Sequence, residues 1–555
     1  MSATGERAAA RRVRSSEERE PATAPRCRIR SVGLRELAVA WLLLGLLGVA
    51  AFGPHVRDGG FYLDDWANAA GSLYPPGGGG FGGALSYFAD LTMYRPVLVL
   101  YVPLTFEAFG THMGWHLAWA AALAVAAAGI LYAILRSAGL PRVDAWLLSA
   151  LVLVFPWFDS IRMWSTAAQV ALAVALYLAG VWLALVAFRR RSPSLHAGSL
   201  LLYAASLLTY EIALALVAAT GLLYVGLVGW RAARGRWLCD GILVLASAIW
   251  VVTQTTRETG GLAAHLDHLR QIVTAGGTLL GRTAVSVAPQ RTSPARDVLG
   301  VAALVAVVAW RRDRRRGRSA SPMLRWLLLG AAGVVVAACG WAPFVPADPY
   351  YTPSVYGITN RVNALAGVGL VMVVYAAIGV VGTLVRATSG SARAGRVVTV
   401  VLACGLGATY LHVIDRHSEI WERAFEAQMA GLAQMKTLNP DLPDGSVLFV
   451  SGYPAYQTLG VPIFSTAWDV NGAIKVQYRN GRLAAYPVIS GTRLVCTAAG
   501  VRLVGFATGE VEVAYGQARL FDVPSGRRAA PRSRAECERT APTFVPGPFY
   551  LDLSY

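Results

Sequence analysis

Two adjacent carboxylates, Asp64 and Asp65, lie in the stretch Phe61-Tyr62-Leu63-Asp64-Asp65-Trp66, just after the first hydrophobic run. A carboxylate can act as a general base, and the second one can orient an acceptor or bind a metal ion. The alternative is a structural function, because carboxylates favour the first turn of a helix. Both functions stay open for this pair, as does the question of which aspartate is the base.

Two arginines are candidates for binding a phosphate group. Arg95 lies in Tyr94-Arg95-Pro96, and Arg361 follows Asn360 directly before a hydrophobic run. A guanidinium group binds phosphate through a planar, bidentate fork. The alternative for Arg95 is an anchor in the lipid headgroups. We expect both arginines to approach one anion site.

Other polar residues fall near hydrophobic runs, where ionisable groups are costly and usually functional. For His116 the alternative is a local hydrogen bond, and for Glu211 it is a buried ion pair with an arginine across the bundle. Most tryptophans and tyrosines near the ends of the runs fit an interfacial belt. The candidates for substrate binding are Tyr94, His116, Arg162, Trp164, Tyr210, Glu211 and Asn360.

The composition indicates a chain embedded in a membrane. Of its 555 residues, 55% are hydrophobic and 15% charged, and the mean hydropathy is +0.47. The net charge of +18 comes from arginine clusters between hydrophobic runs. That arrangement is typical of cytoplasmic loops and argues against a nucleic-acid partner. The clusters lie at 7–35, 136–142, 189–191, 231–236, 311–318 and 386–396.

Segment length and arginine position predict eleven transmembrane helices, with the N-terminus inside and the C-terminus outside. The segment 97–110 is too short to span and is expected to be interfacial or re-entrant. Residues 1–33 are expected to form a disordered basic tail, and the outer loop 54–113 carries the aspartates. The predicted spans are 34–53, 114–135, 144–158, 167–188, two helices within 197–230 that meet at Thr209-Tyr210-Glu211, 238–253, 297–310, 323–344, 363–385 and 397–414.

The composition changes at residue 415, and 415–555 is expected to be a soluble exoplasmic domain, α/β or β-rich, after the transmembrane domain 34–414. An amphipathic helix is predicted over 415–436, and strands over 501–506, 511–515 and 519–523. Asn480-Gly481 predicts a hairpin between 476–479 and 482–486. Cys496 and Cys537 are expected to form a disulfide in this oxidising compartment, with their Cα atoms less than about 7 Å apart.

The order of these motifs resembles the GT-C superfamily of membrane glycosyltransferases. The shared features are a span, an outer Asp-Asp-Trp, Tyr94-Arg95-Pro96, an apolar segment that ends at Phe109-Gly110, and Gly114-Trp115-His116-Leu117. Thr209-Tyr210-Glu211 is also similar to an acidic motif of the protein O-mannosyltransferase-like, polyprenyl-phosphate-sugar-dependent branch. The resemblance covers about residues 34–215.

This resemblance implies a GT-C-like, mainly α fold and a lipid-linked sugar phosphate donor. Asp64 or Asp65 would match the catalytic acid, and Arg95 and Arg361 would bind the donor phosphate. The hexose or pentose would pass, with inversion, to a cell-wall or surface glycan or to a protein. Whether Asp64 or Asp65 also binds a divalent cation, Mg²⁺ or Mn²⁺, stays open.

The arginine-, alanine- and glycine-rich composition is typical of a GC-rich bacterial genome, and therefore predicts the bacterial plasma membrane. Two functions of other classes remain as alternatives. One is a transporter or flippase of lipid-linked sugars, which should show pseudo-repeated halves and polar residues at the bilayer midplane. The other is a non-catalytic polysaccharide assembly protein.

Overall fold

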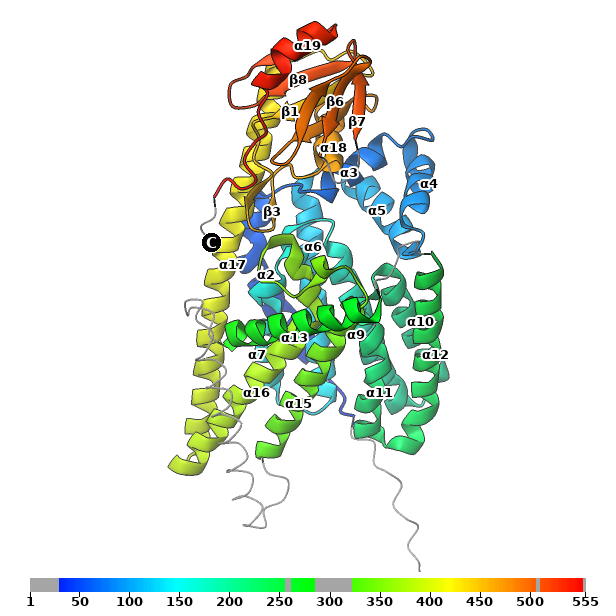
Figure 1. The fold of residues 1–555 in the computed structure, drawn as a ribbon. Coiled ribbons are helices and arrows are strands. Elements are labelled where there is room, and N and C mark those ends of the chain that lie inside the picture. Colours follow the sequence, from blue (N-terminus) through cyan, green and yellow to red (C-terminus); the bar gives the residue numbers. More distant parts are fainter. Residues whose placement is uncertain (1–28, 255–260, 285–321, 506–509, 553–555) are drawn as a thin grey trace, which may run out of the picture.

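The computed structural model describes residues 29–254, 261–284, 322–505 and 510–552. A bundle of helices makes up most of these residues, and small β-sheets cover one end of it (Figure 1). We call this end the sheet end of the bundle. One very long helix, α17 (Ala392–Leu438), runs along the bundle and on past the sheets. Within the bundle, α15 packs on α16, α9 on α10, and α6 on both α2 and α9.

In the described residues, eight helical segments are long and apolar enough to cross a membrane. This finding is compatible with a multi-pass membrane protein. The helices that carry these segments are α2 (Leu34–Asp58), α6 (Met113–Ser137), α9 (Ala168–Arg190), α11 (Leu214–Val228), α12 (Trp230–Gln254), α15 (Pro322–Trp341), α16 (Ala364–Ser389) and α17.

Two shorter helices, α7 (Arg142–Leu153) and α10 (Pro193–Thr209), occupy the places of the predicted third and fifth spans. The predicted eighth span, 297–310, lies outside the described residues, as do most of the tail 1–33 and the arginine cluster 311–318. The count of eleven therefore stays a prediction. Between α10 and α11 the chain is interrupted by a short 3-10 turn, Glu211–Ala213, where the sequence predicted a break.

Several helices near the sheet end are too short to span a bilayer. At about 1.5 Å per residue, the 14 residues of α5 reach only about 21 Å. Figure 1 shows α13 lying across the bundle helices rather than along them. The short helices are α3 (Asp64–Leu73), α4 (Gly80–Thr92), α5 (Pro96–Phe109) and α8 (Ser160–Met163), and the transverse helix is α13 (Leu262–Ala284).

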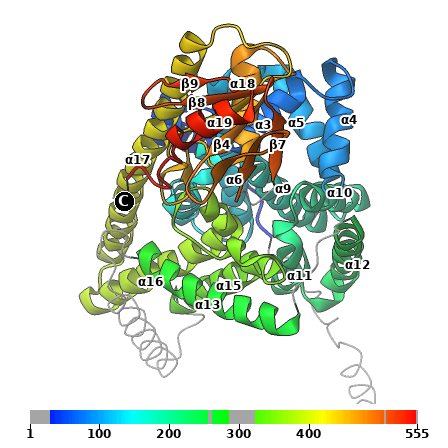
Figure 2. The same ribbon diagram turned by 45° about the horizontal axis from the view of Figure 1, so that its top comes forward.

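The main sheet has the order β4-β1-β8-β9 and is parallel except at β9. A second, antiparallel sheet has the order β5-β6-β7, and β2 pairs with β3. Figure 2 shows these strands and α19 in front of the sheet end. The elements are β1 (Val447–Ser451), β2 (Tyr456–Thr458), β3 (Val461–Pro462), α18 (Ala467–Tyr478), β4 (Ala484–Val488), β5 (Arg493–Cys496), β6 (Gly500–Val504), β7 (Val511–Ala514), β8 (Ala518–Asp522), β9 (Arg528–Ala529) and α19 (Arg534–Thr540).

The hairpin predicted around Asn480-Gly481 is wrong. Residues 476–478 end α18, and β4 pairs in parallel with β1 instead of folding back on its predecessor. A capping box at Thr466 and Asp469 starts this helix, and Arg479 closes it in the left-handed region, with φ 53°. Parallel neighbours need a crossover connection, which α18 supplies. The strands predicted near 501–506, 511–515 and 519–523 correspond to β6, β7 and β8, with Phe506 itself outside the described residues.

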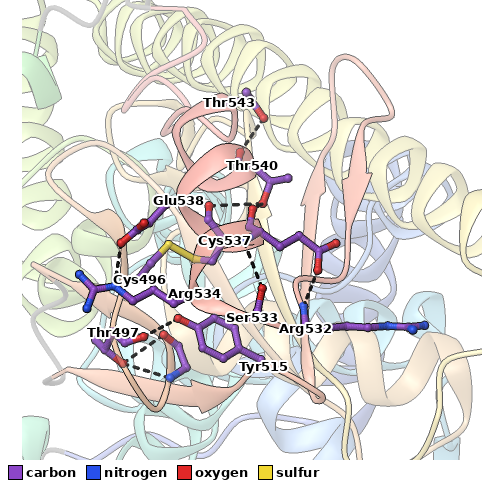
Figure 3. The surroundings of a disulfide bond; sticks show 12 residues. Cys496, Thr497, Tyr515, Arg532, Ser533, Arg534, Cys537, Glu538, Thr540 and Thr543 are labelled. Atoms are coloured by element: carbon purple, nitrogen blue, oxygen red, sulfur yellow. Dashed lines mark hydrogen bonds and ion pairs between the residues drawn. A yellow bond between two sulfur atoms is a disulfide. The ribbon is translucent and has the colours of Figure 1, made fainter.

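Cys496 and Cys537 form the disulfide that the sequence predicted, with their Cα atoms 5.9 Å apart. The bond joins the end of β5 to α19 (Figure 3). Ser533 caps α19 by accepting a hydrogen bond from the backbone N–H of Glu536. The disulfide therefore fixes a short terminal helix that has little core of its own.

The domain boundary predicted at residue 415 falls inside α17, which is continuous over 47 residues. The amphipathic helix predicted over 415–436 is the distal half of this helix. Trp421, Leu432 and Met435 on that half belong to the same buried core as Leu448 of β1 and Ile474 of α18. The main sheet is thus packed on the bundle through a shared apolar core, whereas the β5-β6-β7 sheet belongs to a separate buried cluster.

Candidate functional site

Asp64 and Asp65 are the first two residues of α3, at the sheet end of the bundle. The residue before them, Leu63, has φ 46° and ψ −113°, a conformation that residues other than glycine rarely adopt. This sharp change of direction lets α3 begin directly after the buried residues Phe61 and Tyr62. Adjacent helical residues point about 100° apart, so the two carboxylates meet different surroundings.

Asp65 is almost fully buried and has only structural partners. Its Oδ1 accepts hydrogen bonds from the backbone N–H (2.6 Å) and the hydroxyl (2.5 Å) of Thr166. Its Oδ2 accepts one from the backbone N–H of Tyr62, at 3.0 Å. Burial raises the pKa of Asp65 to about 7, against the opposing effect of these donors. Asp65 joins the start of α3 to the chain before α9, which fits the structural alternative for one of the two carboxylates.

Asp64 faces a different environment and is only partly buried. Its Oδ1 accepts a hydrogen bond from the indole N–H of Trp468 on α18, at 2.8 Å. Burial raises the pKa of Asp64, while the Trp468 N–H and the positive charge of Arg361 act to lower it. Of the two aspartates, Asp64 is therefore the more exposed one, and the positive charge of Arg361 acts on it.

Arg361 lies among aromatic rings. Its guanidinium carbon is 5.3 Å from the ring centroid of Trp164 and 5.6 Å from those of Tyr350 and Tyr351. Its Nη1 donates to the carbonyl of Ile358, at 2.5 Å. Within the described ranges, no carboxylate lies within ion-pair distance of this side chain. Cation–π contacts hold Arg361 in place without cancelling its charge.

Next to these rings lies a cavity of about 260 Å³. It combines polar groups with an apolar wall, and Tyr351 belongs both to this wall and to the surroundings of Arg361. The cavity is lined by Tyr94, Arg95, Tyr210, Glu211, Ile212, Val251, Gln254, Pro343, Phe344, Ala347 and Tyr351.

Arg95 is paired with Glu211 through both nitrogens of its fork. Nε donates to Oε2 at 2.9 Å, and Nη2 to Oε1 at 2.6 Å. The guanidinium group also lies over the rings of Tyr210, at 3.9 Å, and Tyr94, at 5.0 Å. This geometry is the ion pair across the bundle that was one of the two alternatives for Glu211. It also means that the fork of Arg95 is already occupied.

Three other predicted site residues have local partners. His116 bonds to the carbonyl of Gly110 at 2.9 Å, in line with the local hydrogen bond that was its alternative. It lines a separate small cavity with Asp65, whereas Arg95 and Glu211 line the cavity of about 260 Å³. Arg162 is fully buried and donates to the carbonyls of Leu153 and Phe155. Asn360 is buried and bonds to Ser160 and Asp159. Each fits a structural function.

The two aspartates do not fit a metal ion held by both. Mg²⁺ and Mn²⁺ need several oxygen ligands around one point. Both oxygens of Asp65 already accept hydrogen bonds from Thr166 and Tyr62, and Asp64 is turned to Trp468. Within the described part of the chain, no group of three or more histidine, cysteine, aspartate or glutamate residues is arranged to hold a metal ion.

The sequence did not identify Trp468 or Thr166, or the contact of Tyr350 and Tyr351 with Arg361. The tyrosine pair carried a detectable signal, because two adjacent aromatic residues follow Asp348-Pro349 in a predicted outer loop. Trp468 carried none, since 404 residues separate it from Asp64 and only the fold brings them together.

The chain was also compared with known proteins. No protein-family model matches it, and no curated protein is similar enough to count as a match.

Proposed function

We propose that this chain is a GT-C-type membrane glycosyltransferase. It would transfer a sugar from a polyprenyl-phosphate donor to an acceptor outside a bacterial plasma membrane. The observation that carries the proposal is that two groups of opposite charge, a carboxylate and a guanidinium, lie at the sheet end. An accessible carboxylate, Asp64, lies within electrostatic range of Arg361, an arginine that no described carboxylate neutralises.

The cavity beside Arg361 suits a lipid-linked phosphate. Ile212, Val251, Pro343, Phe344 and Ala347 form an apolar wall for the first isoprene units. The phosphate would bind at the polar side, within reach of Arg361. A positive group that faces the departing phosphate stabilises the charge that develops in the transition state, which is usually the largest catalytic contribution. The Arg95–Glu211 pair would hold the shape of the cavity.

The reaction would be a single in-line displacement. An acceptor hydroxyl attacks the anomeric carbon, a new C–O bond forms there, and the bond from that carbon to the phosphate oxygen breaks. The hydroxyl proton passes to the carboxylate of Asp64, and polyprenyl phosphate leaves with both bonding electrons. The anomeric configuration is inverted because attack and departure occur on opposite faces of the sugar.

Turnover of synthetic short-chain prenyl-phosphate sugars by the protein in lipid nanodiscs tests this proposal. Asp64→Asn should lower kcat by about 10²–10⁴-fold, because the base is lost while the shape is kept. Asp90→Asn on α4 is a matched control, since Asp90 is exposed and outside the site. Asp65→Asn should mainly lower stability.

Full activity of the Asp64→Asn protein would show that Asp64 is not the base. A wild-type protein that cleaves none of the donors, but moves them across liposome membranes, would favour the flippase alternative.

A further inference from the structure

Helix α18 of the C-terminal region packs tightly on α3, which carries the aspartates. A Cβ atom at Gly472 would lie only 2.3 Å from the carbonyl oxygen of Trp66, so no larger residue fits there without a shift. Trp468 precedes Gly472 by four residues and therefore lies on the same face of α18. The contact that brings the two helices together also places Trp468 next to Asp64.

Both helices are held in this arrangement from several sides. The capping box of Thr466 and Asp469 fixes the first turn of α18. The indole N–H of Trp66 donates to Gln428 on α17, at 2.9 Å, and Gln428 donates to the carbonyl of Ile463, at 2.8 Å. The position of Trp468 is thus determined by the fold on both sides of the contact.

Trp468 is only partly covered in this position. Its indole N–H is used by Asp64, while the side chain remains 42% exposed. A large aromatic ring with an open surface beside a carboxylate offers a ligand an apolar face to pack against and a polar group to bind. The Tyr350 side chain, which contacts Arg361, is likewise 48% exposed.

We propose that Trp468 is a positioning residue through which the C-terminal region completes the transferase site. Its N–H holds the Asp64 carboxylate in place, and its exposed ring is the surface on which the acceptor sugar packs. This proposal rests on the proposed function and narrows the acceptor from a glycan or a protein to a glycan.

The shape of the contact favours a sugar. A pyranose or furanose ring has a flat face of C–H groups and a rim of hydroxyls. It can therefore cover an aromatic ring and at the same time present one hydroxyl to the carboxylate beside that ring. A serine or threonine side chain of a protein acceptor is too short to cover an indole while its hydroxyl reaches Asp64.

The first test uses Trp468→Phe, which removes the indole N–H but keeps an aromatic ring. It therefore measures the contribution of the N–H alone. A donor N–H favours the charged carboxylate, so its removal raises the pKa of Asp64. Because the carboxylate form is the active base, the acid limb of the profile of kcat/KM against pH should move to higher pH. The control Trp230→Phe, at a 57% exposed residue of α12, should leave that limb in place. An unchanged limb in Trp468→Phe would overturn the orienting function.

The second test removes the ring. Trp468→Ala should raise the KM for a glycan acceptor by about tenfold, and Trp468→Phe much less, because the phenyl ring keeps much of the aromatic surface. Equal KM values in the two variants would overturn the packing function. Thermal unfolding of each variant separates these effects from loss of fold.

A binding measurement keeps this proposal distinct from the proposed function. Saturation-transfer NMR on the full-length protein would use soluble trisaccharides of mannose, glucose, galactose and arabinose, and a threonine-containing pentapeptide. We expect at least one trisaccharide to bind to the wild type and to Trp230→Phe but not to Trp468→Ala. Binding of the peptide alone, or of no probe in a Trp468-dependent way, would overturn the glycan surface. Absence of turnover alone would overturn only the proposed function.

Discussion

Arg95 and Arg361 have the same side chain and adjoin the same group of aromatic residues, yet their surroundings differ in charge. Arg95 shares its two-pronged fork with Glu211, and Tyr210 and Tyr94 cover it. Arg361 contacts three rings and a backbone carbonyl, and no described carboxylate is within ion-pair distance. The first arginine is therefore neutralised inside the protein, whereas the charge of the second is not compensated by a described carboxylate.

The difference shows that arginine in a predicted site is not enough to identify a phosphate ligand. A guanidinium group with a bidentate carboxylate has little left to offer an incoming anion. One held by aromatic faces keeps most of its field, because cation–π contacts do not compensate a full charge. That both arginines bind one phosphate stays a prediction, and the pairing of Arg95 with Glu211 favours Arg361 over Arg95 as the ligand.

Among the changes that test this contrast between the arginines, the largest expected effect comes from Arg361→Gln. The variant keeps a hydrogen-bonding side chain but loses the charge, and kcat should fall by about 10²–10³-fold, as for the removal of one transition-state donor. Single-turnover kinetics with a prenyl-phosphate sugar measure this loss. The kcat of Arg95→Gln, calculated per folded molecule, should fall much less. Equal losses in the two variants would contradict the contrast between the arginines.

Glu211→Gln should act mainly on stability. It removes the charge that compensates the mostly buried Arg95, and hydrogen bonds to charged groups contribute about 1.5–3 kcal/mol. The expected result is a lower midpoint of thermal unfolding in detergent, with activity of the folded fraction retained. A variant that keeps its stability but binds the donor more tightly would show that Arg95 is available to phosphate after all.

Arg95→Lys is a milder change of the same pair. Lysine keeps the positive charge but cannot form the two parallel bonds to Glu211, so the loss of stability should be about 1 kcal/mol. Chemical denaturation of Arg95→Lys and of Arg95→Gln, each compared with the wild type, measures this loss of stability. A large loss of donor affinity with unchanged stability is the outcome that would restore Arg95 as a phosphate ligand.

The smallest expected effect is at Tyr351, which contacts Arg361 and also lines the Arg95 cavity. Tyr351→Leu removes one cation–π contact, which contributes about 0.5–1 kcal/mol, and should raise the donor KM by about two- to fivefold. Tyr351→Phe keeps the ring and serves as the matched control. An equal rise of the donor KM in both variants would show that the hydroxyl of Tyr351, and not its ring, contributes to donor binding.

The sequence predicted most of the bundle because span length and arginine position report directly on helices in a bilayer. The prediction from sequence failed where a local pattern conflicts with the structure that its neighbours form. Asn480-Gly481 is a strong hairpin pattern, but the preceding residues continue a helix that a capping box had already started. The change of composition at residue 415 predicts a domain boundary, although the backbone of α17 continues through it unchanged.

For the site, the sequence identified the carboxylates and arginines but not their partners. Asp64 and Asp65 have the same side chain and adjacent positions, and only the turn at Leu63 and the neighbours of α3 give them different functions. An ion pair of Glu211 with an arginine across the bundle was open as an alternative, but the sequence did not identify Arg95 as that arginine. Trp468 could not be found, since nothing in a single sequence relates α18 to α3.

The continuity of α17 has a mechanical consequence. At about 1.5 Å per residue, its 47 residues form a rod of about 70 Å without a hinge. A tilt of about 5° at the end far from the sheets would displace the other end by about 6 Å, and Tyr478 of α18 is tied to that rod at Met435. Helix tilt responds to bilayer thickness. We therefore expect turnover to depend on the acyl-chain length of the surrounding lipid, with the rod acting as a lever on the Asp64–Trp468 contact.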